Sequence, residues 1–231
     1  MPPSNSKIPV YLEVGAKRTF AVALDWPGWS RGGKGEAAAL QALLDYGPRY
    51  SAAIHSLRLG FKPPTATSAL HVAERVSGDM TTDFGTPGRI PVSDTKPADE
   101  AEIRRMQHIL TACWRHFDVA AEAAKGKTLS TGPRGGGRDR EKIIRHVLEA
   151  EHAYLRRLGV NFQPLVLDLA DAHLPRFRHA MLVGLAASAH GELPAQGPRG
   201  GRYWPARYFA RREAWHVLDH AWELEDRLTG P

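Results

Sequence analysis

The sequence predicts an α+β fold in which a small N-terminal ββα unit is followed by a four-helix bundle. Apolar residues alternate with other residues over 8–14 and 20–26, which is the period of β-strands. From residue 99 onward they recur at spacings of three and four, which is the period of amphipathic helices. The intervening segment contains turn-forming Gly and Pro and almost no apolar periodicity. We therefore expect an α+β unit over residues 1–76, a linker over residues 77–98 and a bundle over residues 99–231.

The composition sets limits on the class of protein. The chain has 231 residues, of which 42% are hydrophobic and 24% are charged, so it can bury a core and is not a disordered tail. No apolar run approaches the roughly 20 residues that span a bilayer, and we expect a cytoplasmic protein that does not bind membranes. Cys113 is the only cysteine, so a Cys-based zinc cluster is excluded. A metal would be held mainly by His, Asp or Glu, and the chain has eleven His.

The predicted N-terminal unit begins with a hairpin. Residues 8–14 and 20–26 are its strands, and the short polar segment 15–18 turns the chain between them. Residues 36–46 are rich in strong helix formers and stop at Gly47-Pro48, which predicts one helix. Residues 70–76 are a weaker candidate for a further strand of the same sheet.

The hairpin corner has the sequence Trp26-Pro27-Gly28-Trp29 and leads through a Gly-containing loop into the Ala-rich helix. With this corner, residues 7–50 resemble a HicB-like ββα unit. The resemblance covers about a fifth of the chain and implies the shape of the unit, and we do not extend it to antitoxin function.

Four helices are expected in the second part of the chain. The acidic pair Asp99-Glu100 marks a helix start, because carboxylates are favourable at the positive end of the helix dipole. Two basic Gly-rich loops, residues 125–138 and 191–201, interrupt the apolar periodicity. The predicted helices are residues 99–124, residues 139–158, residues 165–190 with an interruption at Pro175, and residues 205–228.

Three histidines are the candidate metal ligands. His216 and His220 are four residues apart on the last helix, so their side chains lie on one face and can bind the same ion. His146 lies beside the apolar stripe of the second helix and is the candidate third ligand. Its alternative role is that of an ordinary core histidine with a hydrogen-bond partner. His152 is about 120° around the helix from His146, and we expect it to face solvent.

Two of these helices also resemble those of a known family. Residues 144–158 are similar to the second helix of DinB-like metal-binding bundles, and residues 214–223 are similar to the last helix of that family, which carries a His-x-x-x-His pair. The resemblance spans about residues 97–228. It implies a three-histidine site at His146, His216 and His220 for one divalent metal ion, such as Zn, Ni, Fe or Mn.

The same resemblance implies a class of activity. DinB-like proteins include thiol-dependent S-transferases and isomerases that use mycothiol or bacillithiol. We therefore expect a metal-dependent enzyme with transferase or hydrolase-like activity, and a low-molecular-weight thiol as a further cofactor. Glu149 is near His146 along the helix and is the candidate catalytic residue, which would orient a ligand or relay a proton.

The charge distribution suggests what approaches the site. The formal net charge is +6, and the basic residues gather in segments 125–145 and 197–212. If the helices run up-down-up-down, both segments surround one opening and favour a small anionic substrate there. The candidate substrate-binding residues come from the second segment: Arg202, Tyr203, Trp204, Tyr208 and Arg211.

Two other functions remain open at this point. Basic residues interleaved with aromatic ones also suit single-stranded nucleic acid, although the chain has no recognisable nucleic-acid-binding motif. Alternatively, a fourth protein ligand such as Glu149 would close the metal site, and the ion would only stabilise a binding module. A homodimer is also left open.

The predicted helix directions place the histidines at different heights. His146 lies about six residues into its helix and His216 about eleven into its own, a mismatch of roughly 7 Å for parallel helices. We therefore expect either that residues 202–208 are partly irregular or that the last helix extends beyond its neighbours.

Overall fold

The computed structural model describes residues 7–131, 137–198 and 200–228 of this mixed α/β protein. The chain divides into two compact units, Met1–Lys96 and Pro97–Pro231. Each is described by itself. None of the described helices combines the length and the apolar character that crossing a membrane requires.

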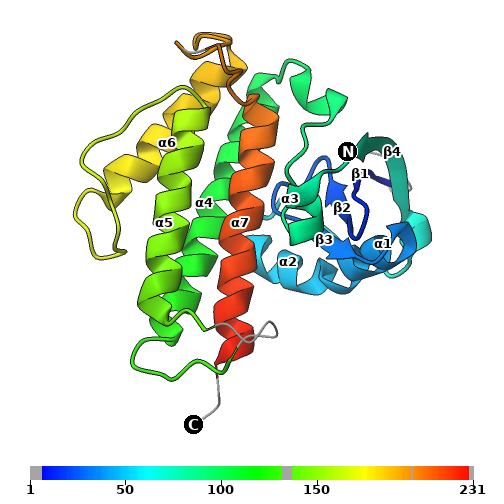
Figure 1. The fold of residues 1–231 in the computed structure, drawn as a ribbon, viewed down its shortest axis with the longest axis horizontal. Helices are drawn as coiled ribbons and strands as arrows, with labels where there is room; N and C mark the ends of the chain where they lie inside the picture. The colour runs from blue at the N-terminus through cyan, green and yellow to red at the C-terminus, as the bar shows by residue number, and fades with distance from the viewer. Residues whose placement is uncertain (1–6, 132–136, 199, 229–231) are drawn as a thin grey trace. The chain divides into compact units, whose positions relative to one another are not determined.

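The first unit is built on a four-stranded sheet with the order β3-β2-β1-β4 (Figure 1). The predicted hairpin is confirmed, because the first two strands pair antiparallel from Val14↔Thr19 onward, and the weaker candidate strand pairs parallel to the first. The third strand was missed because its sequence, Ser-Arg-Gly-Gly, has no apolar side chain; it pairs antiparallel with the second strand. The strands are β1 (Ile8–Val14), β2 (Thr19–Ala23), β3 (Ser30–Gly33) and β4 (Leu70–Ser77).

Two helices follow the third strand. The predicted helix is confirmed as α1 (Glu36–Asp45). The expectation that Gly47-Pro48 ends the helical segment was incomplete, because a second helix, α2 (Gly47–Ile54), begins there. Proline is well tolerated in the first turn of a helix, because an N–H group at that position has no acceptor within the helix. The short 3-10 helices η1 (His55–Leu57) and η2 (Thr67–Ala69) lie between this helix and the last strand.

The segment predicted as a linker is ordered and lies largely within the first unit. It contains α3 (Met80–Phe84) and the 3-10 helix η3 (Val92–Thr95). Asp79 caps α3 by accepting a hydrogen bond from the Thr81 amide at 2.8 Å. Helices this short do not show in apolar periodicity, so the Gly and Pro residues suggested a connection without structure.

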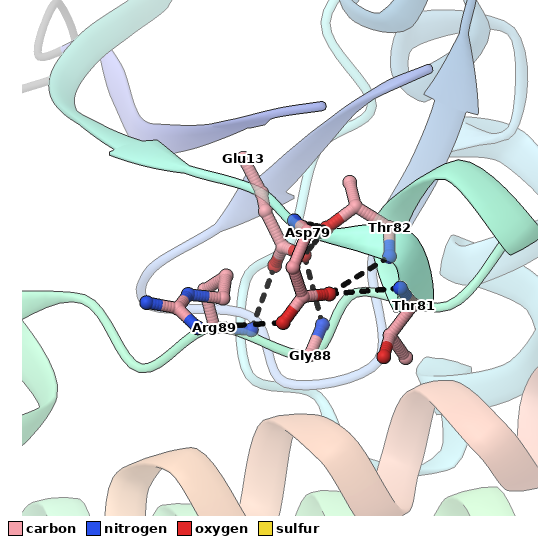
Figure 2. A network of polar contacts seen from close by, with 6 residues as sticks. All are labelled: Glu13, Asp79, Thr81, Thr82, Gly88 and Arg89. Atoms are coloured by element: carbon pink, nitrogen blue, oxygen red, sulfur yellow. Dashed lines mark hydrogen bonds and ion pairs between the residues drawn. The ribbon is translucent and has the colours of Figure 1, made fainter. Parts of the chain in front are cut away.

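A buried carboxylate fastens this segment to the sheet. Glu13 of β1 is fully buried and accepts hydrogen bonds from the Thr82 hydroxyl at 2.5 Å, the Gly88 amide at 2.9 Å and the Arg89 amide at 3.0 Å (Figure 2). Arg89 also reaches Asp79 at 3.3 Å. Three donors on one carboxylate supply the partners that burial requires, so residues 79–89 are part of the fold.

The second unit consists of four long helices that pack against one another (Figure 1). The first starts as predicted, because Asp99 caps it and forms a capping box with Glu102. The third starts later than predicted, since Pro175 lies in its first turn instead of interrupting it. The helices are α4 (Glu100–Ala123), α5 (Arg140–Arg157), α6 (Leu174–Ala189) and α7 (Ala206–Arg227).

The helix directions differ from the up-down-up-down expectation, which was wrong. The Trp204 amide donates to the Arg157 carbonyl at 2.8 Å, so the start of α7 lies beside the end of α5. At the other end, Arg227 donates to the Arg138 carbonyl at 2.9 Å. Helices α5 and α7 are therefore antiparallel, and the connection over residues 158–173 carries the chain back so that α6 runs parallel to α5 (Figure 1).

Two further expectations assumed that α5 and α7 are parallel, and both were wrong. The basic segments that precede α5 and α7 lie at opposite ends of the bundle, so they do not surround one opening. The 7 Å mismatch between the histidines also disappears, because it assumed that both helices start at one end. Residues 202–205 precede the helix, and α7 is regular from Ala206.

Candidate metal centre

Three histidines from two helices meet in the bundle. Nε2 of His146 on α5 lies 3.3 Å from Nε2 of His216 on α7. His220 lies one turn further along α7, and its ring centroid is 4.9 Å from that of His146 and 4.7 Å from that of His216. One potential ligand atom from each residue lies within 4.8 Å of the others. The structure thus brings together the three residues that the sequence singled out.

The three side chains differ in burial. His216 and His220 are buried, whereas His146 is half-buried. The cluster therefore has buried sides on α7 and a more accessible side at His146. Such an arrangement suits a site that is held by the bundle and reached from solvent.

The electrostatic surroundings favour the neutral form of two of these imidazoles, His146 and His216. Burial lowers the pKa of His146 to about 4, and the positive charges of His220 and Arg138 act in the same direction. Burial also holds the pKa of His216 well below its ordinary value, and His220 and Arg212 lower it further. Neutral imidazole is the form that binds a metal ion, because its ring nitrogen offers a lone pair.

The hydrogen-bond geometry is consistent with a cation site. Among the described residues, Nδ1 of His216 is buried without a hydrogen-bond partner, and its Nε2 faces the ring nitrogen of His146. When the ring nitrogens of two neutral imidazoles face each other, at most one of them carries a proton and donates to the other. The third ring adds a further nitrogen lone pair, so some lone pairs of the cluster have no hydrogen-bond donor. A divalent cation would satisfy these lone pairs, and the residues therefore fit such an ion.

Glu223 and Arg227 support the cluster, and the sequence analysis missed both. Glu223 contacts Nδ1 of His220 at 2.7 Å, and Arg227 donates to the same carboxylate at 2.6 Å. Burial raises the pKa of Glu223, but the contacts with His220 and Arg227 outweigh it and leave the pKa below its ordinary value. A carboxylate on the second ring nitrogen is the usual way in which proteins orient a metal-binding histidine. The spacing of three and seven residues after His220 was the available signal, because it places both side chains on the same helix face.

The predicted catalytic residue lies on the same helix as His146 but is exposed. Glu149 is three residues after His146 on α5. Among the described residues, the carboxylate that contacts the histidine cluster by a hydrogen bond is Glu223. The role of Glu149 remains a prediction.

The predicted substrate-binding aromatic residues lie near the start of α7. Tyr208 is buried and Trp204 is half-buried, and their ring centroids are 4.9 Å apart. Trp204 also packs against Tyr154 of α5 at 5.1 Å, and Tyr154 meets the ring of His216 edge-on at 5.6 Å. Trp204 is therefore joined to the cluster through Tyr154. Tyr203 is half-buried and is not part of this series of ring contacts.

Arg212 is a better-placed cation than the predicted arginines. Arg202 is exposed before the helix, and Arg211 is buried. The guanidinium of Arg212 lies 5.1 Å from the ring of Tyr154 and 4.7 Å from that of Trp215. Within the described part of the chain, its buried Nη1 has no hydrogen-bond partner. Its position four residues before His216 could have identified it.

Comparisons of the chain with protein-family models, with curated proteins and with solved structures found no match. The HicB-like and DinB-like resemblances therefore stay predictions from the sequence, and the functional argument depends on the geometry of the site.

Proposed function

We propose that the helical unit binds one divalent metal ion through His146, His216 and His220 and is a metal-dependent enzyme for a small anionic substrate. The observation that carries this proposal is the meeting of three imidazoles whose candidate ligand atoms lie within 4.8 Å of one another. The lowered pKa values of His146 and His216 and the Glu223 contact to His220 support it.

The ligand set favours particular ions and an open site. Imidazole nitrogen suits Zn, Ni and Fe better than Mn, which prefers oxygen ligands. Within the described residues the cluster has three members, the usual number of protein ligands in a catalytic zinc site, where one position is left for water or substrate. A bound divalent ion supplies Lewis acidity, which lowers the pKa of a coordinated thiol or water.

The surrounding side chains fit the binding of an organic anion. Arg212 and Arg138 add positive charge beside the histidines and would attract a carboxylate or phosphate. Tyr154 and Trp204 would pack against the organic part of the molecule. Burial raises the pKa of Tyr154 to about 12, so its hydroxyl stays protonated and can donate a hydrogen bond. A low-molecular-weight thiol is the second reactant that the resemblance to DinB-like bundles implies.

Cobalt substitution tests this proposal. The protein is loaded with Co²⁺, and its absorption spectrum is recorded with and without a low-molecular-weight thiol. Because an open position can accept the thiol, we expect the visible bands to shift and a sulfur-to-metal charge-transfer band to appear. The variant His216→Ala, treated identically, should show neither band. An unchanged spectrum in the wild type would indicate a closed site that only stabilises the bundle.

Single-stranded nucleic acid is the less favoured partner. Tyr208 and Arg211 are buried, so neither is available to stack on a base or contact a phosphate from outside. Arg202 is exposed and could make such a contact. Retention of a labelled oligonucleotide at low salt, which weakens as salt is added, would favour this alternative over the enzyme.

A further inference from the structure

Two buried glutamates face each other in the bundle core, outside the histidine cluster. Glu151 lies on α5 and Glu213 on α7, and both side chains are fully buried. Their carboxyl groups are close enough to interact by a hydrogen bond. The pair therefore connects the two helices that carry the histidines.

Among the described residues, three of the four carboxyl oxygens of this pair lack a hydrogen-bond donor. Oε1 of Glu213 accepts a hydrogen bond from Nε1 of Trp114 at 3.1 Å. Among the residues that the structure describes, no N–H or O–H group donates to Oε2 of Glu213 or to either oxygen of Glu151. A buried carboxylate without donors is costly, and two of them side by side also repel each other.

The neighbouring charges cannot neutralise two carboxylates. Arg178 of α6 is the cation beside the pair, but it already binds Asp118 of α4 through two contacts at 2.6 and 2.8 Å. The other titratable neighbours are uncharged, because burial raises the pKa of the Cys113 thiol and also raises that of Tyr154 to about 12. Among the described residues, one positive charge therefore faces three carboxyl groups.

A proton on one carboxyl group reduces both costs. It removes one negative charge, and its O–H group can donate to one oxygen of the other carboxylate. Glu213 is the better carrier, because its Oε1 already accepts from Trp114 and its Oε2 is left to donate to Glu151. Burial acts in the same direction: it raises the pKa of Glu151 to about 7 and holds that of Glu213 well above its ordinary value, although Arg178 opposes both shifts.

We propose that Glu151 and Glu213 share a proton at neutral pH and form a pH-sensitive clasp between α5 and α7. The clasp does not depend on a bound metal ion. As the pH rises the shared proton is lost, two negative charges meet in the core, and the contact between the helices weakens.

Infrared spectroscopy tests the proposal directly. A protonated carboxylic acid has a carbonyl stretching band that a carboxylate lacks, and ¹³C-labelled glutamate assigns that band to this residue type. We expect metal-free wild-type protein at pH 7 to show the acid band. The band should be lost in Glu213→Gln and retained in Glu141→Gln, a matched change at an exposed position of α5. Absence of the band from the wild type at pH 6 would overturn the proposal.

Unfolding by urea gives a second, independent test. A carboxyl group whose pKa is raised by folding stabilises the protein fully below its unfolded pKa, and this stabilisation is lost as the pH rises through the folded pKa. Between pH 5 and pH 7 the folding equilibrium constant should therefore fall by up to about tenfold per pH unit for each proton released. This fall in the folding equilibrium constant should be absent in Glu213→Gln. Both proteins are measured in the presence of a chelator, so that no metal ion is bound. If that variant does not fold, Glu151→Gln replaces it, and an undiminished fall in a folded variant would contradict the clasp.

Discussion

At the scale of single residues, two side chains support the histidine cluster. Glu223 orients His220, and Arg227 in turn holds Glu223. The shared helix face of His216 and His220 could be predicted from their spacing, and His146 was a candidate because it lies beside the apolar stripe of its own helix. The role of Glu223 was missed, although its position three residues after His220 places it on the same helix face, because a carboxylate near a helix end is usually solvated.

Replacement of Glu223 by Gln should weaken metal binding by about 10- to 100-fold. The amide keeps the size of the side chain but loses the negative charge that orients His220. Competition with a calibrated chelator measures the affinity. Glu225→Gln is the matched control, since Glu225 pairs with His116 at 2.9 Å on another face of α7. Equal affinity in both variants would remove the proposed role of Glu223.

The position of His152 was predicted incorrectly. It was expected to face solvent, and this was wrong, because it is buried. Its ring stacks on Phe177 at 4.0 Å, and its Nε2 accepts a hydrogen bond from the Val166 amide at 3.0 Å. The connection over residues 158–173 covers this helix face, which helical periodicity alone could not reveal.

Replacement of His152 by Phe should lower the free energy of unfolding by about 1–3 kcal/mol, because the buried Val166 amide loses its acceptor. His108→Phe, at an exposed position of α4, should change it by less than about 0.5 kcal/mol. Burial lowers the pKa of His152, so its stabilising contribution is present above the unfolded pKa of 6.5 and is lost as the pH falls. Urea unfolding at pH 5 and 7.5 should show a smaller loss on acidification in the Phe variant than in the wild type, and an equal loss would refute this account.

At the scale of elements, the helices were easier to predict than their directions. Apolar periodicity and caps located α4, α5 and α7 to within a few residues, because both depend on local sequence. The direction of a helix depends on where the preceding connection leads. The connection over residues 158–173 is long enough to reach either end of the bundle. Strand β3 and helix α3 were missed for a related reason, since neither has an apolar period of its own.

Arg227 fastens the end of α7 to the chain before α5. It donates to the carbonyls of Ser130 and Arg138 and to Glu223. Arg227→Met should therefore destabilise the protein by about 2–4 kcal/mol and also weaken metal binding. Arg207→Met removes an ion pair with Glu102 at the other end of α7 and should reduce stability without affecting the metal. Thermal unfolding and chelator competition together separate the two effects, and an unchanged metal affinity in Arg227→Met would contradict the link.

At the scale of the whole molecule, the chain divides into two compact units. The mixed α/β character could be predicted, because the apolar period changes from strand-like to helix-like along the chain. The first unit extends further than expected, to Lys96, since Glu13 binds the segment after the last strand. All three histidines and their supporting residues belong to the second unit.

A fragment of residues 97–231 should fold alone and bind the same number of metal ions as the full chain. It contains a buried core from all four helices, with Phe117, Val147, Phe177 and Leu218 among its members. Circular dichroism during heating and metal titration of the fragment check both statements. A fragment that is helical and cooperative but binds no ion would show that the first unit contributes to the site.

Metal stoichiometry is the most direct test of the central claim. Protein stripped with a chelator is titrated with Zn²⁺ at pH 7.5, and the bound ion is counted by elemental analysis after gel filtration. We predict about one ion per chain in the wild type and in His108→Ala, and none in His216→Ala. A wild-type protein that keeps its helical circular dichroism but retains no divalent ion would contradict the claim.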